Sequence, residues 1–410
     1  MFASLRRHRN YRLYFSGQLV SQIGTWLQNA AQAWLILDLT HSAEAVGVFS
    51  FFLYTPYAAL GLFGGALADR WDRQRVLVVT QTLMALCAAA LALVAYLRID
   101  SLVVLDGLAL VRGSIMAFNN PARQAMMIQL VGRSELPNAI ALNASLNNAT
   151  RIVGPAIAGV LIASVGVAAC FALNAISFIP VIYALAVMRP AEFFATGSRA
   201  RTPLLKSIGD GLTYARRTKT VAIVLGMLFV VSTVSINFNV VLPVLARNTM
   251  HGNAQTYGII AAIFGLGAFA GAIAAASRTR VSPSLLLVAA AGFGAAQLIV
   301  ATQSSLFGVS LALFATGVCY TLYTASSNAI VQLAVPPHMQ GRIAGLYNYV
   351  FLSSGPLGSL LAGWLAERSA SYAFVAGGAA AIAMAGVGYV LRPWPMPTGT
   401  VRPRRRVKLS

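Results

Sequence analysis

The sequence predicts an all-α integral membrane protein in which twelve transmembrane helices form two pseudo-symmetric six-helix bundles. Three observations support this fold class: an apolar composition, a series of twelve apolar runs, and basic residues gathered on one side of the expected membrane. Hydrophobic residues make up 58% of the 410 residues, charged residues only 10%, and the mean hydropathy is +0.72. Ordinary soluble domains carry about 25% charged residues, so we expect lipid rather than water to surround this chain.

Each expected span covers about 20 predominantly apolar residues, the length that crosses a hydrocarbon core. The runs are long and do not alternate apolar with polar residues, which favours helices over a barrel. The first run follows a basic start without a small-residue cleavage site, so we expect an uncleaved span. In order, the expected spans are residues 13–37, 43–67, 76–97, 102–121, 139–163, 168–188, 221–245, 256–276, 284–302, 305–329, 343–366 and 371–391.

The basic residues predict the orientation of these spans. If the N-terminus lies in the cytoplasm, 25 of the 30 Lys and Arg residues fall in inner segments. Two lie within spans, and only Arg98, Arg247 and Arg368 fall in outer segments. By the positive-inside rule, we expect a multi-pass chain with both termini in the cytoplasm. The formal net charge of +20 is then an asymmetry across the lipid bilayer, so we expect no nucleic-acid partner.

The sequence lacks the usual signals of an enzyme or a metal site. Cys87, Cys170 and Cys319 fall in apolar runs and are expected to be buried thiols. The four histidines are scattered over loops and span ends, so we expect no metal site. The chain has no phosphate loop of the form G-x-x-x-x-G-K-[ST], and its ten acids are too scattered for paired catalysis. We therefore expect no cofactor and no enzyme activity.

The chain divides into two related halves. The expected domains are an N-terminal bundle at 1–188, a linker at 189–220 with a short amphipathic helix, a C-terminal bundle at 221–391 and a basic tail at 392–410. Gly154-Pro155 of span 5 recurs 201 residues later in span 11, and the run from Gly65 recurs 206 residues later in span 8. The similar offsets indicate a duplication. Duplicated helical halves are typical of secondary transporters, whose substrate site lies between the halves.

Two motifs carry a family resemblance. The stretch Gly65–Arg75 (GALADRWDRQR) resembles the signature G-x-L-A-D-R-x-G-R-[KR] between the second and third helices of the major facilitator superfamily, with departures at Asp72 and Gln74. Gly154-Pro155 resembles the antiporter motif of the same superfamily. The resemblance covers the whole chain, and it implies the fold of a transporter with two halves.

Further stretches are similar to one branch of that superfamily. Residues 120–123 (NPAR) and Gly341-Arg342 resemble the branch that contains enterobactin exporters and macrolide efflux pumps. The resemblance implies a protein of the bacterial inner membrane that exports a small amphipathic molecule, a siderophore or a drug-like compound, by alternating access and proton antiport. An importer or a lysophospholipid flippase on the same fold stays open as the alternative. We expect a monomer, and an attached sensor is disfavoured because only 18 residues follow Arg392.

The resemblance also assigns roles to residues of the motifs. It implies a gating latch on the cytoplasmic side, for which the alternative is simple anchoring by basic residues. The latch residues are Gly65, Asp69, Arg70 and Arg73. The glycine-proline pairs remove a helix hydrogen bond and let backbones approach, so they serve either bending or tight packing. These residues are Gly154, Pro155, Gly355 and Pro356.

Polar residues inside the spans indicate a cavity, because they are costly in lipid and usually face water or protein. Five of them follow span 1 at steps of four and three, which places them on one face of a helix. They are Gln18, Gln22, Thr25, Asn29 and Gln32. The other candidates are Arg112 in span 4, Asn143, Asn147 and Arg151 in span 5, Asn237 and Asn239 in span 7, Tyr320, Tyr323 and Asn328 in span 10, and Tyr347 in span 11. Hydrogen bonding between helices without substrate contact is the alternative.

The charged residues inside the spans predict the chemistry of the cavity. Arg112 and Arg151 lie too deep to reach the membrane surface, so either they pair with acids or they attract an anionic substrate. Asp38 and Asp106 are the candidate proton-coupling residues, although each could instead be an exposed interfacial acid. We find no clear acid inside the spans of the C-terminal half, so proton coupling is expected to belong to the N-terminal half.

Overall fold

The computed structural model describes residues 3–68, 71–194, 204–278, 282–336 and 339–391. Throughout these ranges the chain is helical, without β-strands. The first half contains α1 (Ala3–Arg7), α2 (Arg9–Thr40), α3 (Ala43–Ala68), α4 (Arg73–Tyr96), α5 (Leu102–Val165) and α6 (Val167–Ala186). The second half follows a short 3₁₀ turn (Pro190–Glu192) and contains α7 (Leu204–Arg217), α8 (Lys219–Ser235), α9 (Phe238–Val244), the π-helical turn η2 (Leu245–Thr249), α10 (Ala254–Ala276), α11 (Pro283–Thr302), α12 (Leu306–Leu333), α13 (Gln340–Arg368) and α14 (Ala370–Val390).

Twelve crossings of a membrane account for these helices. Ten helices of the described ranges are long and apolar enough to cross a bilayer, with α8, α9 and η2 acting as one of them. The 64-residue α5 supplies two crossings, because the chain reverses at Gly132. The 32-residue α2 is not among these ten, because its polar residues lower its mean hydropathy. It is nevertheless long enough to span a membrane. The predicted all-α fold with twelve spans is confirmed.

The turn inside α5 differs from the expected loop at 122–138. Helix continues on both sides of Gly132, which alone leaves helical geometry with φ 69° and ψ 174°. Residues with a side chain rarely adopt this φ. A side chain at Gly132 would also meet the ring of Phe194, 3.0 Å from where its Cβ atom would lie. One glycine therefore makes the reversal, and helix covers the rest of residues 122–138 between the expected spans 102–121 and 139–163.

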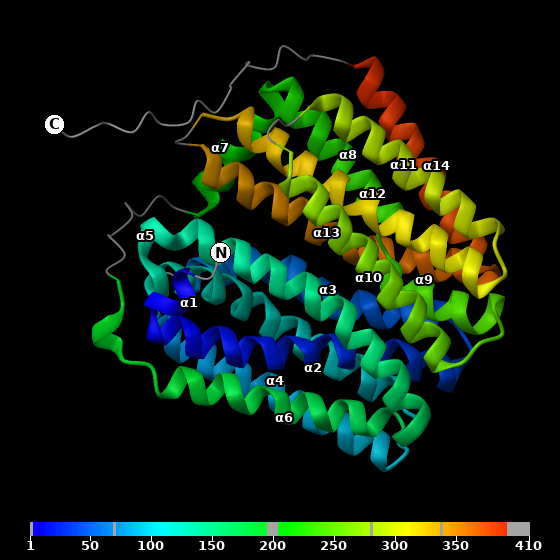
Figure 1. Cartoon of the computed structure of the whole chain (residues 1–410), viewed down its shortest axis with the longest axis horizontal. Helices are drawn as coiled ribbons and strands as arrows, with labels where there is room; N and C mark the ends of the chain where they lie inside the picture. The colour runs from blue at the N-terminus through cyan, green and yellow to red at the C-terminus, as the bar shows by residue number, and fades with distance from the viewer. Residues whose placement is uncertain (1–2, 69–70, 195–203, 279–281, 337–338, 392–410) are drawn as a thin grey trace.

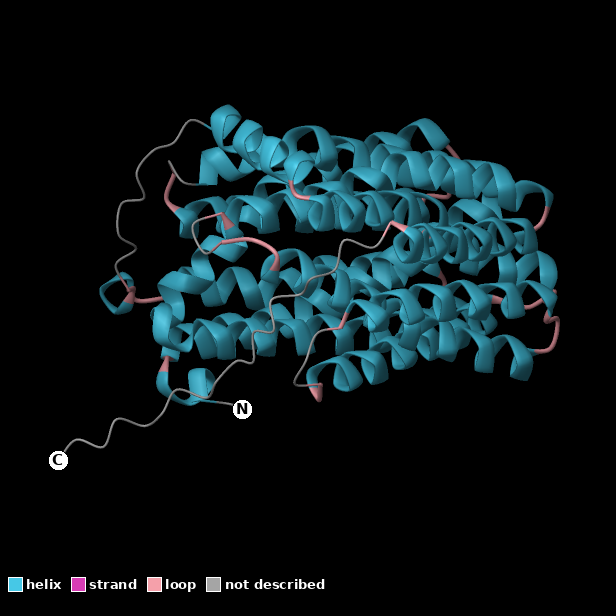
Figure 2. Cartoon of the chain, turned by 90° about the horizontal axis from the view of Figure 1, so that it is seen from above, coloured by secondary structure: helices cyan, strands magenta, loops and turns pink. Residues whose placement is uncertain are grey.

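The helices run roughly parallel to one another and are joined by short connections at two ends (Figure 2). We name the end where α2, α4 and α8 begin the basic face, because Arg9, Arg73 and Lys219 open these helices. The other end, called the opposite face, holds the connections at 41–42, 97–101, 250–253 and 303–305. In Figure 1 the two halves lie one above the other, and α9 lies against α2 and α3 of the first half.

Two helix pairs join the halves near the opposite face. Gly47 of α3 faces Gly363 of α13, and Gly159 of α5 faces Gly258 of α10. A Cβ atom added at Gly47 would lie 2.6 Å from the carbonyl oxygen of Ser359, and one added at Gly258 would lie 2.8 Å from a backbone oxygen of α5. Only small residues let helix backbones approach this closely. The two glycine pairs therefore pack the halves together at this end.

The N-terminal helix α1 is held on the basic face by the turn of α5. The Ser4 hydroxyl donates a hydrogen bond to Asn138 at 2.8 Å, and Arg7 forms an ion pair with Glu135 at 2.7 Å. The hydrogen bond from Arg7 holds the pKa of Glu135 below its usual range. These contacts connect the start of the chain to the point where α5 reverses.

Candidate functional site

A pocket of about 60 Å³ lies between the two halves. The first half contributes Trp26, Asn29 and Ala30 of α2 and Arg151 and Pro155 of α5. The second half contributes Ile236, Phe238, Asn239 and Leu242 around α9, and Tyr257, Ala261 and Phe264 of α10. Sites for drug-sized ligands are usually about 300–1,000 Å³, so a substrate of that size needs more room than the pocket offers in this state.

Arg151 is the charged group of this pocket. Its guanidinium carbon lies over the ring of Trp26 at 5.1 Å and over the ring of Tyr320 at 5.5 Å. Trp26 belongs to the first half and Tyr320 to the second, so the arginine is held between aromatic rings of both halves. Within the described ranges the guanidinium makes no ion pair and no hydrogen bond. Its N–H groups are therefore available to a ligand.

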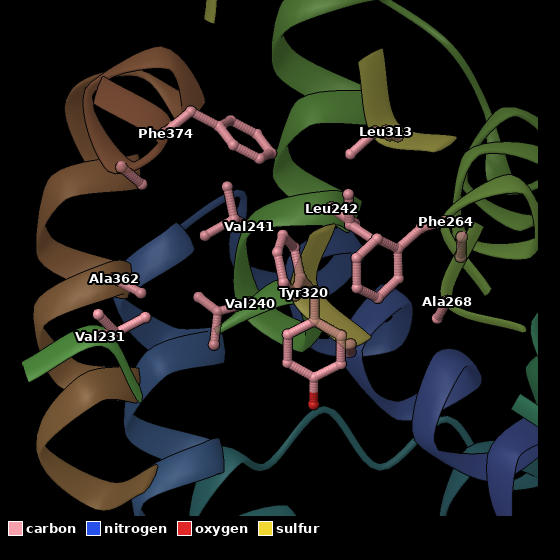
Figure 3. Close-up of a cluster of buried hydrophobic side chains, with 14 of the residues drawn as sticks. Val231, Val240, Val241, Leu242, Phe264, Ala268, Leu313, Tyr320, Ala362 and Phe374 are labelled. Carbon is pink, nitrogen blue, oxygen red and sulfur yellow. The ribbon is translucent and has the colours of Figure 1, made fainter. Parts of the chain in front are cut away.

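Tyr320 is fixed by an aromatic cluster of the second half (Figure 3). Its ring centroid lies 5.9 Å from that of Phe264 and 6.4 Å from that of Phe238. Phe238 and Phe264 are themselves 4.3 Å apart. In Figure 3 the Tyr320 hydroxyl points away from the labelled side chains of the cluster. The cluster therefore presents a rigid ring to Arg151.

Arg112 lies behind the pocket rather than in it. It is 4% exposed and donates hydrogen bonds to the Gln32 side-chain oxygen at 2.8 Å and to the Asn29 side-chain oxygen at 2.5 Å. No acid of the described ranges forms an ion pair with it. The two arginines therefore do not share one hollow, but Asn29 connects them because it touches Arg112 and lines the pocket.

A chain of amides continues from Arg112 into the first half. Gln28 donates to the same Gln32 oxygen at 3.2 Å, and Asn174 of α6 donates to Gln28. Gln28, Gln32 and Asn174 are all nearly fully buried. Of the predicted stripe on α2, Gln32 therefore bonds between helices, and Asn29 faces the pocket.

The other predicted residues of the first half lie nearer the basic face. Gln22 donates a hydrogen bond to Asn147 at 3.2 Å, while the Thr25 hydroxyl bonds to its own helix at Ser21. Gln18 is buried and Asn143 is half-buried. None of these residues lines the described pocket.

The predicted residues of the second half are divided in the same way. Asn239 lines the pocket and donates to the Tyr54 hydroxyl at 3.1 Å, which joins the halves. Asn237 lies where α8 and α9 separate and donates to the Thr233 backbone oxygen at 2.8 Å. Tyr323 is fully buried away from the pocket. Tyr347 shares a hydrogen bond of 2.7 Å with Ser327, and Asn328 accepts one of 2.7 Å from Gln332.

The two candidate acids have different surroundings. Asp38 forms an ion pair with Arg247 of the second half, with 2.6 Å between the carboxylate oxygen and the guanidinium nitrogen. Their side chains are 58% and 24% exposed, and Arg247 also lies over the ring of Trp34. Asp106 is half-buried near the start of α5, with no ion pair to any described residue. Neither acid lines the pocket.

The motif residues are only partly covered by the structure. Asp69 and Arg70 lie outside the described residues, Gly65 lies in the last turns of α3, and Arg73 begins α4. Asp72, a departure from the superfamily signature, caps α4, since its carboxylate accepts the N–H of Arg75 at 2.8 Å. This bond gives a physical reason for an acid at that position.

The glycine-proline pairs differ in how tightly they pack. A Cβ atom at Gly154 would lie 2.4 Å from the Cβ atom of Trp26, so α5 and α2 touch there. Pro155 lines the pocket. A Cβ atom at Gly355 would meet only the Tyr54 ring at ordinary contact distance, 3.4 Å, and Pro356 is buried beside it.

The aromatic walls of the pocket were missed at the level of sequence. Trp26 lies four residues after Gln22 and three before Asn29, so the spacing of the polar stripe includes it. Tyr257 and Phe264 lie in an apolar helix without such a signal. Within the described ranges, no three histidine, cysteine or carboxylate side chains lie together as ligands for a metal ion.

Comparison with known proteins identifies the family. A family model described as a transmembrane secretion effector matches residues 1–405. The chain is 29% identical to the enterobactin exporter EntS of Escherichia coli O1:K1 / APEC, over 88% of this chain and 86% of that protein. It is 23% identical to macrolide efflux protein A of Streptococcus pyogenes, over 89% of this chain and 92% of that protein.

The fold agrees with solved structures. A crystal structure of the nucleoside transporter NupG superposes with a TM-score of 0.76 at 12% identity, covering 94% of this chain and all of that one. The similarity of fold, the whole-length family match and the efflux relatives agree with one another. The chain is a secondary transporter of small molecules and not an enzyme, and it belongs to the transmembrane secretion effector family of the major facilitator superfamily.

Proposed function

We propose that this transporter exports a small amphipathic molecule, a siderophore or a drug-like compound, from the bacterial cytoplasm in exchange for protons. The observation that carries the proposal is Arg151, whose N–H groups are open to the pocket between two aromatic rings, one from each half. A ligand bound there touches both halves at once. Alternating access requires such a site, because the substrate must stay bound while the halves move.

We infer that the basic face lies in the cytoplasm with both termini. The distribution of basic residues along the sequence supports this orientation, since 25 of 30 fall in the segments that are expected on the cytoplasmic side. The closed end formed by the glycine pairs then faces the periplasm. Loading of the pocket from the cytoplasm is then the first step of export, and it requires the halves to separate further on the basic face than they do in this state.

The proton path is assigned to the first half. Asp106 supports it because it is half-buried inside a span and has no ion-pair partner in the described ranges. In the present state Arg247 of the second half holds the Asp38 carboxylate in an ion pair, and this pair separates when the opposite face opens. Gly65, Asp69, Arg70 and Arg73 remain the proposed latch for the alternate state, in which the cytoplasmic side closes. We propose that a monomer carries out the cycle.

The direction of transport is tested with inverted membrane vesicles that contain the protein and an imposed pH gradient, acid inside. An exporter that exchanges protons accumulates a labelled siderophore or macrolide inside such vesicles, and the accumulation disappears when a protonophore collapses the gradient. Vesicles with Asp106→Asn and Asp38→Asn test the coupling residues. Full gradient-dependent accumulation by both variants would remove the two acids from the mechanism.

The alternative is an importer or a lysophospholipid flippase on the same fold. Uptake of the labelled compound by right-side-out cells, without accumulation in inverted vesicles, would establish import. Movement of a fluorescent lysophospholipid between leaflets of proteoliposomes, without transport of water-soluble compounds, would establish the flippase.

A further inference from the structure

We propose that the pocket binds an aromatic carboxylate, with the carboxylate on Arg151 and Asn29 and the aromatic ring against the pocket wall. This inference rests on the proposed function, in which the pocket is the substrate site, and it names the chemical class that the site prefers. It goes beyond the general expectation of an amphipathic substrate because it assigns charge, shape and binding groups.

The geometry of Arg151 indicates a planar oxyanion. Trp26 and Tyr320 lie against the guanidinium group by cation–π contact at 5.1 and 5.5 Å. Within the described ranges no protein group accepts a hydrogen bond from the Arg151 guanidinium, so its N–H edge is available. A carboxylate matches that edge with two parallel hydrogen bonds. A single-atom acceptor such as a hydroxyl uses only part of the edge.

Arg112 prepares a second donor for the same anion. Its guanidinium donates to the side-chain oxygen of Asn29 at 2.5 Å, so that oxygen is occupied on the side away from the pocket. The amide nitrogen of Asn29, a donor with two hydrogens, is left for the pocket that Asn29 lines. The positive charge of Arg112 further polarises this amide. Arg112 is therefore a positioning residue that makes Asn29 a donor.

The charge balance of the site excludes a cationic ligand. Two arginines lie in or directly behind the pocket, and no carboxylate of the described ranges lines it. An anion compensates this charge, whereas a cation would add to it in a medium of low dielectric constant. The charges around the pocket therefore favour an anionic ligand, whatever its shape.

The wall of the pocket favours a ring attached to the anion. Trp26, Phe238, Tyr257 and Phe264 line the pocket. Aromatic pairs in offset or edge-to-face arrangement gain free energy beyond the area that they bury. Their rings come from both halves, so an aromatic ligand also bridges the moving parts. An aliphatic acid would accept hydrogen bonds from Arg151 and Asn29 but would not gain the aromatic contacts with the pocket wall.

The test compares three small benzene derivatives that differ in charge, using the purified full-length protein in detergent, with dissociation constants from isothermal titration. The probes are benzoate, benzamide and benzylammonium, and acetate serves as the anion without a ring. We expect benzoate to bind about 10- to 100-fold more tightly than benzamide, the ratio of a charge-assisted hydrogen bond to a neutral one. Benzylammonium should not bind, and acetate should bind more weakly than benzoate.

Variants connect the preference to the residues. Arg151→Gln should abolish the preference of benzoate over benzamide, and Arg151→Lys should keep part of it, because lysine retains the charge but not the two-pronged edge. Arg368→Gln is the matched control, since Arg368 also lies over a tryptophan ring, Trp364 at 4.3 Å, but does not line the pocket. The control should keep the full preference.

Three results would overturn the inference: equal binding of benzoate and benzamide, an undiminished preference in Arg151→Gln, or no binding of any probe at millimolar concentration. The vesicle assay separates this failure from failure of the proposed function. Gradient-driven accumulation of a neutral compound, together with equal binding of benzoate and benzamide, would leave export intact and remove the anionic substrate class. Benzoate preference without any transport into inverted vesicles would support the anionic ligand class and contradict export.

Discussion

Arg112 is a charged side chain that the fold buries with amides alone as partners. The Asn29 and Gln32 oxygens accept its hydrogen bonds, and no described acid forms an ion pair with it. A charge placed in a membrane span costs about 2.5–3.5 kcal/mol at the helix centre on insertion scales. Hydrogen bonds to a charged group return about 1.5–3 kcal/mol each. The two bonds together return about 3–6 kcal/mol, so at the lower end of that range they only just offset the cost of the charge.

We therefore predict that Arg112→Met changes binding far more than stability. The free energy of unfolding should stay within about 1 kcal/mol of the parent, because the lost hydrogen bonds offset the relief of burying a charge. The preference for benzoate over benzamide should fall, because Asn29 loses the partner that orients it. Thermal melting in detergent and isothermal titration measure the two effects.

Arg112→Lys serves as the conservative variant for this prediction. It keeps the charge but reaches one amide rather than two, so it should recover part of the benzoate preference. A large loss of thermal stability in Arg112→Met with an unchanged benzoate preference would show instead that Arg112 acts only in the packing of the first half.

The sequence predicted both arginines as cavity residues, but only Arg151 lines the described pocket and Arg112 lies behind it. Arg112 and Arg151 lie on the two arms of α5, on either side of the reversal at Gly132. How each arm is rotated about its own axis depends on packing against α2 and α3, which no local pattern records. The same limit applies to Tyr323, whose polar tip suggested a cavity although its large ring is fully buried.

Among the helices, the spacing of polar residues predicted α2 and its polar face, but no pattern in the sequence predicted the close packing at the glycine pairs. The spacing of four and three along α2 correctly implies one polar face, but part of that face bonds to α5 and α6 instead of lining the pocket. The amide side chain has the same sequence signature in both roles, because lipid excludes it either way. The glycine pairs of the opposite face gave no signal at all, since 35 glycines are spread over the chain.

We predict that a large residue in a glycine pair opens the opposite face. Gly47→Leu and Gly258→Leu place side chains where a backbone oxygen of the facing helix lies 2.6 or 2.8 Å from the new Cβ atom. Leucine favours the helix itself more than glycine does, so the helices should still form while the halves separate. Spin labels at Asp100→Cys and Ser304→Cys, in a background without the native cysteines, report the distance across this face.

Gly226→Leu is the matched control for the glycine pairs. No atom lies within 4 Å of an added Cβ at Gly226, so the distance distribution should match that of the parent. If Gly47→Leu and Gly258→Leu also keep the parent distribution in folded protein, the glycine pairs do not hold this face closed.

Among the described residues, the two halves meet through few polar contacts, and most of these lie toward the opposite face. The Asp38–Arg247 ion pair joins α2 to the π-helical turn η2, and the Glu367 carboxylate of α13 accepts hydrogen bonds from the Ser42 hydroxyl and the Glu44 N–H, both at 3.0 Å. These bonds must break for the pocket to open on that side. They set the balance between the two states, because a carrier needs both at similar free energy.

We predict that removal of the ion pair shifts this balance by a small and measurable amount. Because the Asp38 and Arg247 side chains are 58% and 24% exposed, the pair should contribute only about 0.2–1 kcal/mol. Asp38→Asn or Arg247→Gln should therefore raise the population ratio of open to closed protein about 1.4- to 5-fold. The double variant should resemble either single one, and high salt should reduce the difference from the parent.

The exchanged pair Asp38→Arg with Arg247→Asp should restore the closed state. Glu44→Gln, which removes another acid of the same face and half, should leave the populations unchanged. Equal spin-label distributions for the parent and both single variants would show that the ion pair does not help to hold the opposite face closed, and that the glycine pairs do so without it.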